Sequence, residues 1–304
     1  MLYDPQHQPH LTKDWVFRAL LGVAALMRSF GAALAMQTSG ILLGLPLAPL
    51  ALSLPMPRRL GENLLQGLPD TVMALVISWG LLKYAHQAKL ADLGLGLDWG
   101  VVREALLGLA GGMLCLGLVV LPMFPLAEPQ WKDVESRLGS LTSVLLLTGL
   151  LGLAAFSEEL ILRGYAFQSL VYPLDLTGAL LVTSGAFAAL HLGNRGANEI
   201  TVANTFLAGC ALGLLVAWRR SLWIATGAHL GWNLATILLG LNVSGITVPL
   251  RPFRLSWKGA EAWTGGDYGP EGSVVCTAVL LVLVLVLIRL YYQREEDEAA
   301  KTEV

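Results

Sequence analysis

The sequence FSEELILRGY, residues 156–165, places two adjacent carboxylates and an arginine inside what otherwise reads as a membrane helix. The run before it, residues 141–156, has no polar side chains except hydroxyls. Ionisable groups at membrane depth cost roughly 2.5–3.5 kcal/mol each, so they are rare and usually serve a function. A helix that simply emerges into water at Glu158 is the plainer alternative, but residues 165–171 are too apolar for a solvated end.

Helical spacing gives the two glutamates different roles. Glu159 and Arg163 are four residues apart and share a helix face, with the glutamate first, which is the favourable order. Glu158 points about 100° away around the helix and has no local partner. We therefore expect Glu159 to neutralise Arg163, and we expect Glu158 to be free to act as a general base.

Composition assigns the chain to the membrane. Of its 304 residues, 55% are hydrophobic and only 14% are charged, and the apolar residues form long blocks instead of amphipathic stripes. The net charge of −2 provides no basic surface for nucleic acid. The three cysteines have neither metal-site nor disulfide spacing, and we expect them to be small buried residues: Cys115, Cys210 and Cys276.

The apolar blocks predict an all-α, polytopic membrane bundle of about eight transmembrane helices around a central polar cavity. The expected order is a polar leader with a possible interfacial helix (1–28), three accessory membrane helices (29–137), four catalytic core helices (138–242), an extramembrane loop (243–272), an eighth membrane helix (273–292) and a solvated acidic tail (293–304). A modest excess of Lys and Arg on the side of the termini predicts that both termini are cytoplasmic. The expected location is the bacterial cytoplasmic, or inner, membrane.

Two histidines and an asparagine also lie in apolar sequence. His191 ends the fifth expected span, as far after the predicted turn at 172–175 as Glu158 lies before it. Equal distances from the turn of an antiparallel helix pair mean equal depth, so these two side chains can face each other. His229 and Asn233 are four residues apart on the seventh span and share one face. For His229 to reach Glu158, the helical hairpin that carries Glu158 and His191 must extend beyond the membrane. It must do so on the side of Arg219 and Arg220, where the sixth expected span ends.

These residues predict a hydrolytic site. Glu158, assisted by His191, would deprotonate a water molecule that attacks an amide carbonyl. His229 and Asn233 would donate hydrogen bonds to the developing oxyanion, a role worth roughly 3–4 kcal/mol per donor. The neighbouring ion pair would hold the rotation of the helix that carries the first glutamate.

Three ordered motifs resemble those of the CPBP (Abi) family, which comprises the CAAX prenyl endopeptidases type II and their bacterial relatives. They are EExxxR beginning at Glu158, FxxxH from Phe187 to His191, and HxxxN from His229 to Asn233. Each motif alone is weak, but the three in this order are specific.

The resemblance covers about residues 90–272 and includes two further segments, DLGL at 92–95 and SLW at 221–223. It implies an eight-helix intramembrane endopeptidase that acts on a peptide or membrane-protein substrate within the lipid bilayer. It also implies a glutamate-activated water with no required cofactor, and it gives supporting roles to the ion pair and to Phe187.

Four alternatives stay open. A zinc-dependent variant would use Glu158, His191 and His229 as ligands, although the chain has no HExxH segment. A catalytically inactive scaffold or immunity protein could share the fold, because a fold does not guarantee activity. A rhomboid-like serine protease would pair Ser184 with His229, but it leaves both glutamates unexplained. A proton-relay transporter would be expected to carry inverted repeats, and none is visible in the sequence.

Overall fold

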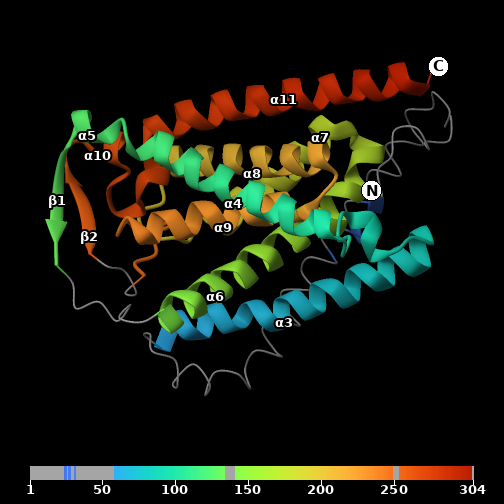
Figure 1. Ribbon diagram of the computed structural model, residues 1–304, viewed down its shortest axis with the longest axis horizontal. Helices are drawn as coiled ribbons and strands as arrows, with labels where there is room; N and C mark the ends of the chain where they lie inside the picture. The colour runs from blue at the N-terminus through green and yellow to red at the C-terminus, as the bar shows by residue number, and fades with distance from the viewer. Residues whose placement is uncertain are drawn as a thin grey trace.

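The computed structural model describes residues 24, 25, 27, 28, 31, 58–133, 141–248 and 253–302. It shows a bundle of long helices with a small two-stranded sheet at one end (Figure 1). Most of the expected leader (1–28), and nearly all of residues 29–57 at the start of the expected accessory helices, lie outside the described residues.

The accessory elements come first in the described chain. They are α3 (Arg58–Leu81), the π-helical turn η3 (Leu82–His86), the 3₁₀ turn η4 (Leu90–Leu93), α4 (Trp99–Val120), the short α5 (Met123–Leu126) and strand β1 (Glu128–Lys132). Helix α4 begins where Asp98 caps it, because its carboxylate accepts a hydrogen bond from the Gly100 backbone N–H at 2.7 Å.

The core elements carry the three motifs. They are α6 (Leu141–Glu159), the π-helical segment η5 (Leu160–Ala166), α7 (Phe167–Leu190), α8 (Glu199–Arg219) and α9 (Leu222–Leu238). The chain leaves helical geometry at Gly164 (ψ −114°) and at Asp175 (φ 59°). The second break lies in the predicted turn. The first was not expected, because the sequence predicts one continuous span through this region.

The last elements form the cap and the final helix. They are β2 (Arg254–Lys258), α10 (Glu261–Thr264), the 3₁₀ turns η6 (Gly266–Tyr268) and η7 (Pro270–Gly272), and α11 (Val274–Thr302). Strand β2 pairs antiparallel with β1, and Ser256 lies opposite Gln130. The sequence predicts only an irregular loop here, because strands that pair across more than a hundred residues leave no local signal.

Helix α11 extends through the described part of the expected acidic tail, and most of residues 293–301 are exposed. The helix continues to Thr302 instead of ending with the apolar block. Within this extension, Glu298 Oε2 lies 2.6 Å from Arg220 Nη2, and Arg294 pairs with the same glutamate at 2.8 Å. The acidic segment therefore attaches the end of α11 to the turn between α8 and α9.

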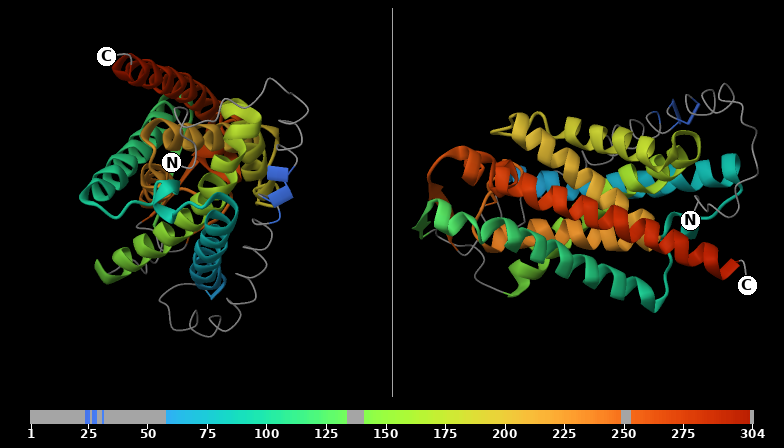
Figure 2. Two further views of the ribbon diagram at one scale, coloured as in Figure 1. Left: turned by 90° about the vertical axis from the view of Figure 1, so that its right-hand side faces the viewer. Right: turned by 90° about the horizontal axis from the view of Figure 1, so that it is seen from above.

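Helices α4 and α9 pack backbone against backbone, and Figure 2 shows α4 along one side of the bundle, next to α9. Each helix presents two glycines four residues apart: Gly108 and Gly112 on α4, Gly227 and Gly231 on α9. A Cβ atom on Gly112 would lie 2.0 Å from the carbonyl oxygen of Ala228, so only glycine permits this approach.

The two segments that look familial outside the motifs lie together. The backbone N–H of Leu222 donates to the Gly94 carbonyl at 3.1 Å, and the Gln168 amide donates to the Leu93 carbonyl at 3.0 Å. Residues 160–171 are all buried around this joint. The start of α7 is thus joined through residues 93 and 94 to the turn between α8 and α9, the end of the bundle where the sequence predicts the hairpin.

Four helical stretches among the described residues are long and apolar enough to cross a membrane: Trp99–Leu126, Val144–Leu190, Glu199–Arg219 and Val274–Lys301. The protein is therefore a mostly α-helical, multi-pass membrane protein. The expectation of eight spans, and of cytoplasmic termini in a bacterial inner membrane, stays a prediction.

Candidate active site

The expected ion pair at the end of α6 is present and completely enclosed. Arg163 Nη1 lies 3.2 Å from Glu159 Oε1, and both side chains have no exposed surface. Arg163 also donates through Nη2 to the backbone carbonyl of Gly209 on α8, at 3.3 Å. The pair therefore joins the start of the hairpin to α8, in addition to fixing its own helix.

Glu159 has a second partner that the sequence does not predict. Its Oε1 lies 2.9 Å from His229 Nδ1 on α9. Because an ion-paired carboxylate accepts hydrogen bonds and cannot donate them, we assign the proton to Nδ1 of this ring. Nε2 of the same ring faces the other glutamate, with Glu158 Oε2 at 4.0 Å. His229 thus contacts both glutamates.

Glu158 is the accessible member of the glutamate pair. Its side chain is 43% exposed, whereas that of Glu159 is 0% exposed, as expected for neighbours that point about 100° apart on a helix. Among the described residues, it makes no recorded hydrogen bond or ion pair with His191. The recorded polar contact that links Glu158 to the other site residues is the one with His229.

Phe187 lies between the two histidines. Its ring centroid is 4.6 Å from that of His191 and 6.0 Å from that of His229, and both pairs are edge-on. The guanidinium carbon of Arg163 sits 4.5 Å from the same ring centroid. His191 Nδ1 donates to the Phe187 carbonyl at 2.8 Å, so Nε2 of the neutral ring is an acceptor. Phe187, the first residue of the second motif, therefore packs against both histidines and Arg163.

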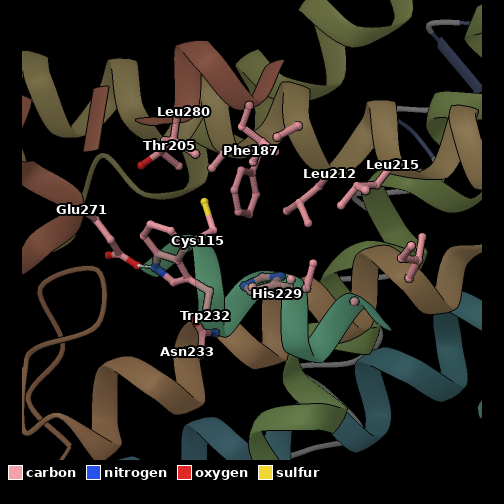
Figure 3. Close-up of a pocket in the computed structure, with 18 of the residues that line it drawn as sticks. Cys115, Phe187, Thr205, Leu212, Leu215, His229, Trp232, Asn233, Glu271 and Leu280 are labelled. Carbon is pink, nitrogen blue, oxygen red and sulfur yellow. Dashed lines mark hydrogen bonds between the residues drawn. The ribbon is translucent and has the colours of Figure 1, made fainter. Parts of the chain in front are cut away.

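A cavity of about 410 Å³ runs between α4, α8, α9 and α11 (Figure 3). His191, His229 and Asn233 all line it, and most of its remaining wall is apolar. Glu158 is not part of the lining. The structure thus gathers three of the four expected site residues around one space and places the fourth against His229.

Glu271, in η7, lines the same cavity and was not predicted from the sequence. Its Oε1 accepts a hydrogen bond from Trp232 Nε1 at 2.7 Å, which Figure 3 shows, and its Oε2 accepts one from Ser244 Oγ at 2.7 Å. Burial raises the pKa of the Glu271 carboxyl above its ordinary value. The only signal in the sequence is a lone acid just before an apolar block, which is too common to indicate a site.

Two alternatives find no support in this arrangement. Within the described ranges, no three His, Cys, Asp or Glu side chains are grouped so that they could hold a metal ion. Ser184 is completely buried and does not line the cavity, while the His229 ring is engaged by Glu159. In the described part of the chain, Ser184 and His229 therefore make no recorded contact of the kind that a rhomboid-like site requires.

Comparison with known proteins returns one family. Residues 140–235 match the model of a family described as type II CAAX prenyl endopeptidase Rce1-like. The match begins just before α6 and ends within α9, so it contains all three motifs. No curated protein and no solved structure matches the chain.

Proposed function

We propose that the protein is an intramembrane endopeptidase, because residues 140–235 match the model of the type II CAAX prenyl endopeptidase Rce1-like family. The family implies a protease. The observation that best supports the specific site is the position of His229, which contacts Glu159, faces Glu158 and lines the same cavity as Asn233. These contacts join the first and third motifs into one polar cluster beside an apolar space.

Glu158 is the proposed general base. Its carboxylate is the one that solvent reaches, whereas that of Glu159 is occupied by Arg163. His191 assists, because its Nδ1–H is donated to a backbone carbonyl and its Nε2 can accept a proton from water. Glu158 takes one proton from the water, and the resulting hydroxide attacks the carbonyl carbon of the substrate peptide bond.

His229 and Asn233 are the proposed hydrogen-bond donors to the oxyanion. They share one face of α9 and both line the cavity. Since His229 Nδ1–H already donates to Glu159, donation from Nε2 requires the imidazolium form, whose charge the two nearby carboxylates offset. When the carbon–nitrogen bond breaks, the proton held by Glu158 passes to the leaving amine, which completes the hydrolysis.

Purified protein incubated with a peptide library, followed by mass spectrometry of the products, tests the proposal. Wild type should cleave a subset of peptides, and Glu158→Gln should cleave the same peptides roughly 10²–10⁴-fold more slowly. Glu128→Gln is the matched control, because this glutamate is 64% exposed on β1 and far outside the cavity lining. Absence of cleavage by wild type would favour the inactive scaffold or immunity protein.

The zinc-dependent alternative has its own test on the same preparation. We expect cleavage to persist after incubation with a strong chelator, because the proposed steps use only protein side chains and water. Loss of cleavage that added Zn²⁺ restores would contradict this expectation.

Comparison of membrane peptides from cells with wild type or Glu158→Gln would then identify the natural substrate.

A further inference from the structure

Glu271 is a buried carboxylate that the proposed mechanism does not use. It lies outside the segment matched by the family model. Its two oxygens accept hydrogen bonds from the Trp232 indole, from the Ser244 hydroxyl and from the Ser244 backbone N–H. Its own backbone carbonyl accepts a hydrogen bond from the Asn204 amide on α8, at 2.7 Å. The side chain is therefore held in one position on the cavity wall.

Among the described residues, the ionisable group that acts electrostatically on this carboxylate is the His191 imidazole, and no permanently charged cation pairs with it. All three donors to it are neutral, and no Lys or Arg is recorded within ion-pair distance. Arg219 is the one Lys or Arg in the described lining of the cavity, but its guanidinium is bound to Glu104. Arg219 is also fifteen residues along α8 from Asn204, about 22 Å away. It therefore cannot compensate the charge of Glu271.

Glu271 lies next to the proposed reaction centre. Its hydrogen-bond partner Trp232 directly precedes Asn233 and follows His229 by three residues, which is less than one helical turn. All four side chains line one cavity, as Figure 3 shows for this group. A bound peptide whose scissile carbonyl accepts hydrogen bonds from His229 and Asn233 would thus pass within reach of the Glu271 carboxylate.

We infer that Glu271 recognises a positively charged lysine or arginine side chain of the substrate, close to the scissile bond. The inference rests on the proposed peptidase function. A buried carboxylate without a cation is costly, and a bound ammonium or guanidinium group removes that cost through a charge-assisted hydrogen bond. The walls around Glu271 are otherwise apolar or neutral, so they offer no competing anion.

A purely structural role, in which Glu271 only holds Trp232 in place, makes a different prediction. Glu271→Gln keeps a side-chain oxygen of the same reach that can accept from the indole, but it loses the charge. Glu271→Asp keeps the charge but shortens the reach to Trp232. Recognition of a cation therefore survives in the aspartate variant and is lost in the glutamine variant, whereas a positioning role gives the opposite order.

The test uses N-acetylated peptides that differ only by Lys, Gln or Glu at single positions on either side of the scissile bond. Both kcat/KM and the Kd of fluorescent versions are measured for wild type and the two variants. Wild type should prefer Lys over Gln at one position by about tenfold or more, as expected for a charge-assisted hydrogen bond. Glu271→Gln should abolish that preference and still process the Gln peptide, and Glu271→Asp should retain it.

Three outcomes would overturn the inference: no preference for Lys in wild type, an unchanged preference in Glu271→Gln, or an equal loss for all peptides in that variant. Glu261→Gln is the matched control, because this exposed glutamate on α10 does not line the cavity. If wild type binds the peptides without cleaving them, the peptidase function fails, while the ratio of Kd values still decides the role of Glu271.

Discussion

At the scale of the residue, the two adjacent glutamates differ because one helical step turns them into different surroundings. Glu159 is enclosed with Arg163 and His229, whereas Glu158 keeps 43% of its side-chain surface exposed. Removing one member of a buried ion pair leaves the other as an uncompensated charge, which costs about 3–5 kcal/mol. A partly exposed carboxylate without a close ion pair carries no such penalty.

Substitution of the two glutamates should therefore separate stability from catalysis. We expect Glu159→Gln to lower the free energy of unfolding by about 3–5 kcal/mol, because Arg163 loses its buried partner. Glu158→Gln should leave stability within about 0.5 kcal/mol of wild type while slowing cleavage roughly 10²–10⁴-fold. Unfolding measured in one detergent checks both variants. Equal destabilisation by the two substitutions would contradict the assignment of their roles.

The pH dependence of stability should report on Glu271. Burial raises its pKa above the ordinary 4.5, so the folded state holds this proton more tightly than the unfolded chain does. This tighter proton binding stabilises the folded state. The stabilisation is complete below the pKa of Glu271 in the unfolded chain and is lost as pH rises through its pKa in the folded protein. Wild type should therefore lose stability relative to Glu271→Gln as pH rises above 4.5. Parallel unfolding curves for the two proteins across pH 4–8 would show that Glu271 does not titrate in this way.

At the scale of the element, the contact between α4 and α9 sets the position of the site. Helix α9 carries His229, Trp232 and Asn233, and its backbone touches that of α4 through glycines on both sides. The approach is close because no side chain intervenes, so a single added methyl group must push the helices apart. The packing of two membrane helices thereby controls where the oxyanion donors stand.

Gly112→Ala tests this dependence. Its new Cβ would lie 2.0 Å from the Ala228 carbonyl oxygen, so the helices must separate, at a cost of about 1–3 kcal/mol. Cleavage should fall as well, since α9 moves. Gly117→Ala, on the same helix, is the control: nothing lies within 4 Å of its Cβ, and it should be neutral or stabilising. Equal effects of the two substitutions on unfolding would show that this contact is not critical.

At the scale of the whole molecule, the side of the membrane on which the chain ends is a prediction from charge distribution alone. A green fluorescent protein fused after residue 304 should fluoresce, because it matures in the cytoplasm and not after export as an unfolded chain. Alkaline phosphatase fused at the same position should be inactive, because it requires an oxidising compartment. The reverse pair of results would invert the predicted topology.

Local sequence patterns predicted the features that depend on helical spacing. The Glu159–Arg163 pair and the shared face of His229 and Asn233 follow from a separation of four residues, and the turn near Asp175 follows from turn chemistry. Features that depend on tertiary packing could not be predicted. The Glu159–His229 hydrogen bond joins helices seventy residues apart, and the β1–β2 sheet joins segments still farther apart.

Two features that were not predicted have the same cause. Glu271 reaches the cavity only because η7 folds back beside Trp232, and no periodicity in residues 243–272 reports that path. The acidic end of α11 is paired only because Arg220 stands opposite it after the bundle forms. In both cases, the partner lies on another element, and its position is known only from the fold.

The central claim is that residues from separate helices act together as one hydrolytic site. Its most direct measurement is a double-mutant cycle of kcat/KM on one cleaved peptide, with Glu158→Gln, His191→Ala and the combination. When two groups act as a unit, the first substitution already removes most of the rate enhancement that they provide together. The kcat/KM of the double variant should therefore be close to that of the less active single variant. Multiplicative losses, with the two substitutions acting independently, would contradict the account.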